Sequence, residues 1–408
     1  MILTNHFYPE DFRVNDLAFE LSKRNYDVTV ITAIPDYPQG KYFDGYSIFK
    51  KRREKTHGVN VIRLFITPRG RGGTLRLMLN YLSYLISSLL FVFFHSFQVR
   101  YDVVLVHMTS PFFITLPGVY LKRYKGVPLI LWILDLWPES VAAAGGITNR
   151  RILRALDLMV KNVYKHSDKI LVGSDTFKTS ISKKGDFAKK LIYFPNWADS
   201  ISSVSIGEAY KLVEPFHSKT PFDFIFLFAG NLGEAQNIDF LLQVIASIKV
   251  DSRVKFVFMG DGRKRVPLMN KAHSLGLTEI CFFPGRFPQS SMPYFISRAD
   301  VMVVSLKNDP IFSLTVPAKV QFYMSQGKPI LAILDGEGAR IIQECQCGIV
   351  VSPSNTQGFQ SAISQFLRLS KNQLLELGDN GRRYYTEHFA KEKRIDQIES
   401  LLRSLVKA

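Results

Sequence analysis

The sequence predicts an α/β protein made of two doubly wound domains, each with a parallel sheet covered by helices. Short apolar, β-branched runs alternate with helical patterns along the whole chain, and these runs are apolar throughout. Strands buried on both faces of a parallel sheet have this composition. Strand–helix alternation is typical of doubly wound folds. The length of 408 residues fits two domains, since one domain has about 100–200 residues.

The first half of the chain is predicted to form an N-terminal Rossmann-like domain over residues 1–199. Its helices include RVNDLAFELSKR and RRILRALDLMVKNVYKHS, where apolar residues recur every three or four positions. Its strands are predicted at DVTVIT, VNVIRLF, DVVLVHM, PLILWILD, KILVGS and LIYFPN.

The second half repeats the alternation and predicts a C-terminal Rossmann-like domain over residues 222–408. A polar stretch follows FPNWAD, and residues 200–221 are predicted to be the linker. The last helix is a candidate for packing back on the N-terminal domain. Strands of this domain are predicted at FDFIFLFAG, VKFVFMG, ICFFPG, DVMVVSL, PILAIL and GIVV.

Composition and charge narrow the class of protein. The three cysteines (Cys281, Cys345 and Cys347) lack metal-site spacing and favour a reducing compartment without a disulfide framework. The net charge is +17, and residues 1–195 hold 28 Lys and Arg against 15 Asp and Glu. Such one-sided charge predicts an anionic partner: nucleic acid, a membrane surface or a phosphorylated substrate. We expect no nucleic acid, because no recognition motif is present.

The basic excess leads directly into an apolar helix. Nine basic residues and one acid lie between Lys50 and Arg76, and no charged residue follows until after Val99. A spanning helix needs about 20 apolar residues, but polar residues and tyrosines interrupt this one. We therefore expect a half-buried helix at a membrane surface, with an ordinary packed helix or a true span as alternatives. The predicted membrane contacts are Lys50, Lys51, Arg52, Arg53, Arg69, Arg71, Arg76, Leu77, Tyr81 and Tyr84.

Glycine-rich turns follow the strands predicted for the second domain. In open parallel sheets, ligands bind beyond the carboxyl ends of the strands. Glycines admit a close ligand, and helix N-termini bind phosphate. The turns predict a phosphate-bearing ligand, without a P-loop or a dinucleotide fingerprint. The residues at these strand ends include Gly230, Asn231, Gly233, Gly262, Arg263, Arg286, Ser305, Gly336 and Glu337.

Lys319 lies in the first turn of a predicted helix that begins at Pro317. Proline is favourable at a helix start, whereas a cation there opposes the helix dipole. A lysine in this position suggests a bound anion, although a solvent-facing lysine is the simpler alternative.

In the first domain, polar side chains also follow the strands. Asn5 and His6 come after the first strand, His107 closes DVVLVH, and Asp135 closes LILWILD shortly before Glu139. We expect His107 and Asp135 to face the ligand-binding edge of the sheet.

Together these segments resemble glycosyltransferase family 4, whose members have the GT-B fold of two Rossmann-like domains facing across a cleft. The resemblance covers nearly the whole chain and is strongest for the O-antigen and colanic-acid branch, typified by WbuB-like N-acetyl-L-fucosamine transferases. The segments are FYPEDFRVNDLAFEL, ITAIPDYPQG, LWILDLWPES, SDKILVGSDTF, FPNWAD, LFAGNLGEAQNIDFLL, GDG, VPAKVQFYMSQGKPILA and LDGEG.

The resemblance implies a reaction and its partners. The second domain would hold a nucleotide-diphosphate sugar, and the first a sugar carried on a polyprenyl diphosphate. Members are generally independent of metals and cofactors, with protein cations stabilising the leaving diphosphate. The enzyme would lie peripherally on the cytoplasmic face of the bacterial inner membrane, where the basic region meets anionic lipid.

The resemblance also implies roles for single residues. Gly230 and Gly233 match the loop over the diphosphate, where Asn231 and Gln236 replace the arginine and lysine of many relatives. Asp135 is the first candidate for a catalytic group, followed by His107 and Glu139. Lys319 and Arg286 or Arg263 would face the diphosphate.

Two glutamates that many relatives use to hold the donor are absent from this sequence. The corresponding positions hold Leu314 and Phe322. Two alternatives stay open: a sugar-nucleotide 2-epimerase, which shares the two-domain fold, and a non-catalytic partner protein that has kept the fold and lost its carboxylates.

Overall fold

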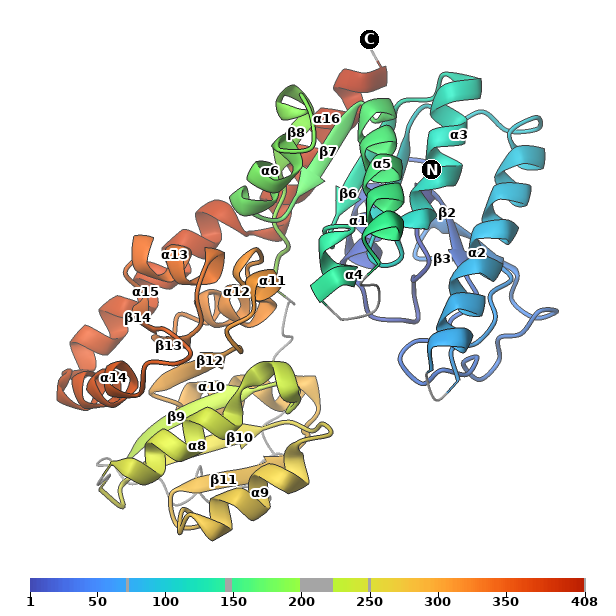
Figure 1. Cartoon of the computed structure of the whole chain (residues 1–408). Coiled ribbons are helices and arrows are strands. Elements are labelled where there is room, and N and C mark those ends of the chain that lie inside the picture. Colours follow the sequence, from blue (N-terminus) through green and yellow to red (C-terminus); the bar gives the residue numbers. More distant parts are fainter. Residues whose placement is uncertain (71–72, 144–148, 199–222, 249–250, 407–408) are drawn as a thin grey trace. The chain divides into compact units, whose positions relative to one another are not determined.

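The computed structural model describes residues 1–70, 73–143, 149–198, 223–248 and 251–406. The chain forms two compact units (Figure 1), which we call unit 1 (Met1–Asn196 with Glu392–Ala408) and unit 2 (Trp197–Lys391). The predicted linker at residues 200–221 lies outside the described residues.

Unit 1 contains an eight-stranded sheet in the order β3-β4-β2-β1-β5-β6-β7-β8. All neighbouring strands are parallel except β3, which runs antiparallel to β4 at the edge. The order reverses between β1 and β5, which makes this the switch point where ligands bind in such sheets. The strands are β1 (Ile2–Leu3), β2 (Thr29–Ala33), β3 (Arg53–Thr56), β4 (Val59–Leu64), β5 (Val104–Met108), β6 (Leu129–Ile133), β7 (Lys169–Val172) and β8 (Leu191–Tyr193).

The helices of unit 1 connect these strands. The helices are α1 (Arg13–Lys23), α2 (Thr74–His95), α3 (Leu116–Lys125), α4 (Glu139–Ala143), α5 (Arg150–His166), α6 (Asp175–Ser182) and α16 (Lys391–Val406), with 3₁₀ turns at Phe112–Thr115 and Ala188–Lys190. Capping residues set several helix ends. At the start of α5, the Asn149 side chain accepts a hydrogen bond from the backbone N–H of Arg151. At the end of α3, Gly126 adopts the left-handed conformation.

Helix α2 packs one face against unit 1 and leaves an apolar face exposed. Asn80, Tyr84, Ser88 and Val92 recur every fourth residue and are buried. The Tyr84 hydroxyl donates a hydrogen bond to the carbonyl of Thr4 at 2.6 Å, so its predicted membrane contact is wrong. Large apolar side chains are exposed along the rest of the helix: Leu75, Met78, Leu79, Leu82, Ile86, Leu90, Phe93 and Phe94.

Unit 2 contains a six-stranded parallel sheet in the order β11-β10-β9-β12-β13-β14. Its switch point lies between β9 and β12. Every strand run predicted for this half contains one of the observed strands. These are β9 (Phe224–Ala229), β10 (Val254–Met259), β11 (Cys281–Gly285), β12 (Val301–Ser305), β13 (Ile330–Ile333) and β14 (Gly348–Val351).

Helices cover both faces of the unit 2 sheet, as a doubly wound fold requires. Helices α8, α9 and α14 share one apolar core with alternate residues of the strands, including Phe226, Phe256 and Val303. Helix α12 packs against β12, β13 and α15. The helices are α8 (Ile238–Ser247), α9 (Arg265–Ser274), α10 (Met292–Arg298), α11 (Pro310–Ser313), α12 (Ala318–Ser325), α13 (Glu337–Glu344), α14 (Thr356–Arg368) and α15 (Lys371–His388), with 3₁₀ turns at Glu234–Gln236 and Gln289–Ser291.

The C-terminal helix α16 belongs to unit 1 although it follows unit 2 in the chain. Arg24 of α1 pairs with Asp396 and Glu399 at 2.6 and 2.7 Å. Ile398 is fully buried beside Leu171 of β7. The last helix therefore completes the packing of unit 1.

Candidate active site

The carboxyl edge of unit 2 is shaped by two glycines at the ends of adjacent strands. Gly230 follows β9 with φ 141°, and Gly260 follows β10 with φ 139°. A Cβ atom on Gly260 would lie 1.8 Å from the carbonyl oxygen of Gly230. Only glycine permits this close approach with positive φ. The two turns therefore present exposed backbone at the edge of the sheet.

Lys319 lies against the first of these turns. A Cβ on Gly230 would lie only 2.5 Å from the Lys319 Cε atom, and the Lys319 Nζ lies 4.8 Å from the centre of the Phe228 ring. One helical turn later, the Tyr323 hydroxyl bonds both backbone groups of Ala229 at 3.1 and 3.2 Å. Because residues four apart share a helix face, this anchor fixes Lys319 beside Gly230.

The environment of Lys319 changes its acidity. Burial lowers the pKa of its ammonium group to about 8, because a charge loses solvation inside a protein. No ion pair of Lys319 occurs within the part of the chain that the structure describes. An anion bound at this edge would restore the lost interaction.

A cavity of about 400 Å³ opens at the same edge of unit 2. Ligand pockets in proteins have about 300–1,000 Å³, so this one has room for a small ligand. Arg286 is one of its lining residues, whereas Arg263 is exposed and lies outside the lining. The cavity is lined by Ala229, Gly230, Asn231, Met259, Gly260, Asp261, Arg286, Phe287, Gln289 and Met292.

The first loop holds the remaining predicted residues close together. The Gln236 side chain folds back to accept a hydrogen bond from the backbone N–H of Gly233 at 3.0 Å. Gly262 packs against this loop, since a Cβ there would lie 2.4 Å from the carbonyl oxygen of Leu232. Asn231 is exposed toward the cavity edge.

Three further predicted residues lie at the ends of β12 and β13. Ser305 ends β12 and is buried, and its hydroxyl has no partner among the described residues. Gly336 precedes α13 at φ 80°, and a Cβ there would lie 2.1 Å from the carbonyl oxygen of Ser313. Glu337 is buried and pairs with Arg340 at 2.8 Å, so its carboxylate is already engaged.

Leu314 and Phe322 occupy the positions of the absent glutamates. Leu314 caps the end of α11, and Phe322 lies half-buried on α12. Apolar side chains therefore stand at both positions, while the glycine turns and Lys319 lie at the edge of the sheet as expected.

In unit 1, Asp135 lies just beyond the end of β6. The Ser110 hydroxyl donates a hydrogen bond to its carboxylate at 2.7 Å, and the indole N–H of Trp137 donates to the Ser110 oxygen at 3.0 Å. Burial raises the pKa of Asp135 above its ordinary value, although these hydrogen bonds act in the opposite direction. A carboxylate with a raised pKa is suited to accept a proton.

His107 does not face the ligand-binding edge, and that expectation is wrong. It lies within β5, fully buried, with its Nδ1 atom 3.1 Å from the Thr4 hydroxyl. Its ring packs edge-on against Trp132 at 4.9 Å. Burial lowers the pKa of His107 to about 3, so the ring is neutral and belongs to the core.

Glu139 begins α4 and pairs with Lys184 at 2.7 Å. Lys184 also pairs with Asp157 at 2.8 Å. These contacts tie α4 to neighbouring segments, and they favour a structural role for Glu139 over the predicted catalytic one.

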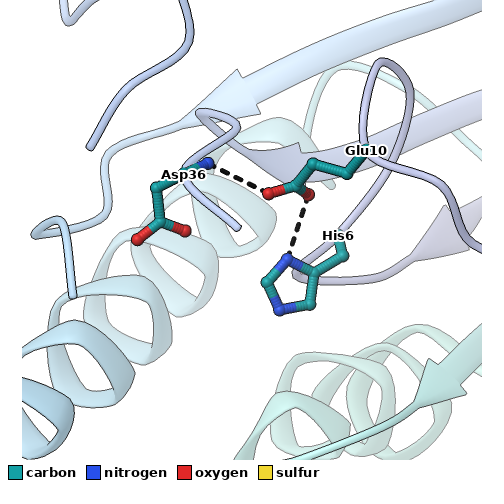
Figure 2. A group of neighbouring side chains, drawn as sticks. All are labelled: His6, Glu10 and Asp36. Atoms are coloured by element: carbon teal, nitrogen blue, oxygen red, sulfur yellow. Dashed lines mark hydrogen bonds and ion pairs between the residues drawn. The ribbon is translucent and has the colours of Figure 1, made fainter. Parts of the chain in front are cut away.

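A buried polar network follows β1, at the switch point of the unit 1 sheet. Figure 2 shows its centre: His6 Nδ1 lies 3.0 Å from Glu10, whose other oxygen accepts the backbone N–H of Asp36 at 3.0 Å. That oxygen also accepts the backbone N–H of Tyr37 at 2.7 Å. Asn5, beside His6, accepts a hydrogen bond from Thr109 at 3.0 Å.

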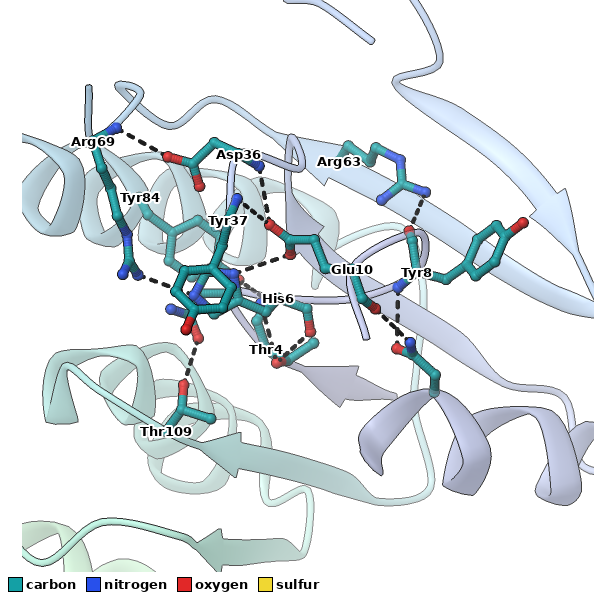
Figure 3. A network of polar contacts seen from close by, with 12 residues as sticks. Thr4, His6, Tyr8, Glu10, Asp36, Tyr37, Arg63, Arg69, Tyr84 and Thr109 are labelled. Carbon is teal, nitrogen blue, oxygen red and sulfur yellow. Dashed lines mark hydrogen bonds and ion pairs between the residues drawn. The ribbon is translucent and has the colours of Figure 1, made fainter. Parts of the chain in front are cut away.

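Arg69, a predicted membrane contact, joins this network through both its backbone and its guanidinium. Its Nη2 lies 3.0 Å from His6 Nε2 (Figure 3), and its backbone N–H donates to Asp36 at 3.0 Å. The guanidinium lies 5.3 Å from the centre of the Tyr37 ring and 5.7 Å from that of Tyr81.

His6 was predicted to follow the first strand. Glu10 and Asp36 lie within the motifs FYPEDFRVNDLAFEL and ITAIPDYPQG, but the sequence predicted no role for them. One carboxyl or imidazole atom from each lies within 4.8 Å of the others, a spacing that a metal ion can use. Both Glu10 oxygens and both His6 ring nitrogens already have protein partners. The group therefore fits a hydrogen-bonded network better than a metal site.

The other predicted membrane contacts lie at different depths. Lys50, Lys51, Arg53 and Arg76 are exposed, while Leu77 and Tyr81 are half-buried. Arg52 donates hydrogen bonds to the carbonyls of Ile48 and Arg63, so part of its charge serves the local fold. Arg71 lies outside the described residues.

Two family models match the chain, one in each half. Residues 12–197 match the glycosyl transferase 4-like domain, and residues 214–384 match the glycosyl transferases group 1 domain. The chain is a glycosyltransferase with the GT-B fold. Both halves of the chain match glycosyltransferase domain models, in agreement with the activity and the fold that the resemblance implied.

Two relatives support this class. The chain is 26% identical to the probable glycosyltransferase WbjE of Pseudomonas aeruginosa, over 75% of this chain and 76% of that protein. It is 23% identical to the putative colanic acid biosynthesis glycosyl transferase WcaI of Escherichia coli (strain K12), over 86% of this chain and 87% of that protein. The chain is thus a glycosyltransferase of polysaccharide biosynthesis.

Solved structures share the fold at low sequence identity. HepE of Anabaena, in a complex with UDP, has a TM-score of 0.69 and is 15% identical, and the match covers 99% of this chain and 98% of HepE. At this identity the likeness concerns the fold alone.

Proposed function

We propose that the protein transfers a sugar from a nucleotide-diphosphate donor to a sugar carried on a polyprenyl diphosphate. The single observation that supports the donor half most strongly is Lys319, half-buried against the Gly230 turn, which lines a cavity of about 400 Å³. A fixed cation and exposed backbone at a strand end match the charge of a leaving diphosphate.

The donor nucleotide is proposed to be UDP. HepE, which shares the fold, binds UDP. The cavity beside Gly230 and Arg286 would take the nucleotide, with the diphosphate toward Lys319. The sugar is proposed to be of the N-acetyl-L-fucosamine type: apolar Leu314 and Phe322 suit a 6-deoxy sugar, which has fewer hydroxyl groups to bind.

In unit 1, Asp135 is proposed to accept the proton of the acceptor hydroxyl. Asp135 lies at the carboxyl edge, its pKa is raised by burial, and the Ser110 hydroxyl fixes its orientation. The protein needs no metal in this proposal, because Lys319 and backbone N–H groups supply the positive charge.

The direct test is an assay with purified protein, a panel of UDP-sugars and polyprenyl-diphosphate-linked N-acetylglucosamine. We expect radiolabelled sugar to move into the lipid fraction. Free epimerised nucleotide-sugar would instead support the 2-epimerase. No product from any donor, with a relative such as WcaI active in the same assay, would support the non-catalytic alternative. The glycosyltransferase matches do not favour either alternative.

The acceptor lipid is proposed to reach the enzyme at the cytoplasmic face of the inner membrane. Among the described residues, α2 is the one helix long and apolar enough to cross a bilayer. Its Asn80–Val92 face is packed in unit 1, which supports a helix lying on the membrane. Lys50, Lys51, Arg53 and Arg76 are exposed, and their positive charge complements anionic lipid.

We expect the protein to float with vesicles that contain anionic lipid. Replacing both Leu82 and Ile86, each about half exposed, by glutamate should weaken partitioning at least about tenfold, because it removes apolar contact and adds repulsion. Flotation in a sucrose gradient measures this. Leu158→Glu, which alters an exposed apolar side chain on α5, is the matched control and should still float. Wild-type protein that stays at the bottom would contradict the proposal.

A further inference from the structure

We propose that Arg69 binds a phosphate group of the lipid-linked acceptor, at the switch point of the unit 1 sheet. This deepens the proposed function and rests on it for the identity of the anion. Figure 3 shows Arg69 within the polar network that contains His6 and Asp36.

The guanidinium of Arg69 is held in place from several sides. His6 Nε2 accepts a hydrogen bond from Nη2 at 3.0 Å. The ring centres of Tyr37 and Tyr81 lie 5.3 and 5.7 Å away, within the distance at which aromatic faces attract cations. The Arg69 backbone is fixed by Asp36. Such a side chain loses little further freedom when it binds a ligand.

The hydrogen-bond partners of His6 indicate which of its ring nitrogens carries a proton. A guanidinium only donates hydrogen bonds, so His6 Nε2 must be an acceptor without a proton. The ring proton then lies on Nδ1 and is donated to Glu10 at 3.0 Å. In this tautomer His6 links the Glu10 carboxylate to Arg69 and orients the guanidinium.

The positive charge of Arg69 has no carboxylate partner of its own. Asp36 bonds the backbone N–H of Arg69, not its guanidinium. Within the described ranges no carboxylate oxygen pairs with that guanidinium, and its buried Nε donor has no partner. Buried donors are normally satisfied, and phosphate oxygens suit the forked geometry of arginine.

The surroundings indicate which anion this is. Arg69 lies beside Asn5 and His6, which follow β1, where ligands bind in this kind of sheet. Burial raises the pKa of Tyr81, and the charges of Arg69 and Asp135 both act on the same hydroxyl. Tyr81 itself belongs to α2, whose outer face is apolar. Phosphate at Arg69 thus places the sugar toward Asp135 and the lipid along α2.

The test compares two acceptors with the same sugar, one on a polyprenyl diphosphate and one on an uncharged long-chain alcohol. In the wild type we expect kcat/KM to favour the diphosphate. In Arg69→Gln that preference should fall about 10- to 100-fold, the loss expected for a charge-assisted hydrogen bond. The change should appear in the acceptor KM, with the donor KM unchanged. Arg69→Lys should recover part of the preference for the diphosphate acceptor.

A second measurement does not depend on sugar transfer. Geranylgeranyl diphosphate in detergent micelles should bind wild-type protein at least about ten times more tightly than Arg69→Gln, by calorimetry. Arg154→Gln, an exposed arginine on α5, is the control and should bind like wild type. A protein that binds this lipid through Arg69 but transfers no sugar would refute only the proposed function.

Two results would overturn the assignment. One is equal lipid-diphosphate binding and equal acceptor preference in wild type and Arg69→Gln. The other is a change confined to the donor KM, which would mean that Arg69 meets the donor phosphates. Competition by inorganic pyrophosphate as strong as that by the lipid would identify a site for free phosphates and would also contradict the proposal.

Discussion

Lys319→Ala is expected to lower kcat about 100- to 1,000-fold, the effect of removing one group that stabilises developing charge. The lysine lies against the Gly230 turn and is anchored through Tyr323. The loop after Gly230 supplies no second cation, because Asn231 and Gln236 stand where the resemblance implied an arginine and a lysine. Initial rates with saturating donor measure the effect.

The acidity of Lys319 gives this prediction a second signature. Burial lowers its pKa to about 8, so the cation is present below that pH and is lost above it. Affinity for UDP should therefore fall as the pH rises from 7 to 9. Lys307→Ala, an exposed lysine paired with Glu234 at the same edge, is the control. Equal pH profiles for wild type and Lys319→Ala would exclude the diphosphate contact.

Asp135→Asn is expected to lower kcat about 100- to 10,000-fold while UDP binding stays unchanged, because the amide cannot accept a proton. The Ser110 hydrogen bond can persist to the amide oxygen, so the fold should be retained. Rapid-quench measurements of transfer, together with calorimetry of UDP binding, separate these two effects.

The pH profile tests the same residue independently. Burial raises the pKa of Asp135, so its carboxylate is present above that pKa and is lost as the pH falls through it. Activity should decline on the acid side at a higher pH than an exposed aspartate would give. Glu139→Gln is the contrasting variant, since Glu139 is held by Lys184. A larger loss for Glu139→Gln than for Asp135→Asn would reverse the two roles.

The strands that form the two sheets are predictable because both of their faces are buried. Leu129–Ile133 and Val301–Ser305 are buried at every position, so their apolar runs need no alternation. The strand at Arg53–Thr56 has the opposite character: it is a charged edge strand that pairs on one side only. A solvent-exposed basic segment without a strand has the same composition, so the sequence alone does not distinguish an edge strand from such a segment.

The positions of site residues can be predicted where the residues follow a strand. They cannot be predicted where the role depends on whether the side chain is buried in the core or exposed. Lys319 could be found because its charge conflicts with its place at a helix start. His107 differs because β5 extends one residue past it, which leaves the ring inside the core. Tyr84 and Arg69 belong to a basic and apolar segment whose composition hides which side chains turn inward.

The network around His6 could not be predicted, because it joins residues far apart in the chain. His6 and Arg69 are separated by 63 positions, and their contact depends on the crossing from β4 into α2. The spacing of residues in a motif indicates which side chains are neighbours within one helix or strand. This cluster instead depends on the order of the strands in the folded sheet.

The return of α16 to unit 1 has a consequence for how the protein is made. A ribosome adds about 5–20 residues each second, so the stretch between Asn196 and Glu392 takes roughly 10–40 seconds to synthesise. During this time the Leu171 side of unit 1 lacks the Ile398 side chain that covers it. Nascent chains released before residue 392 would expose this apolar surface to chaperones and proteases. The packing of unit 1 is therefore complete only after α16 has been synthesised.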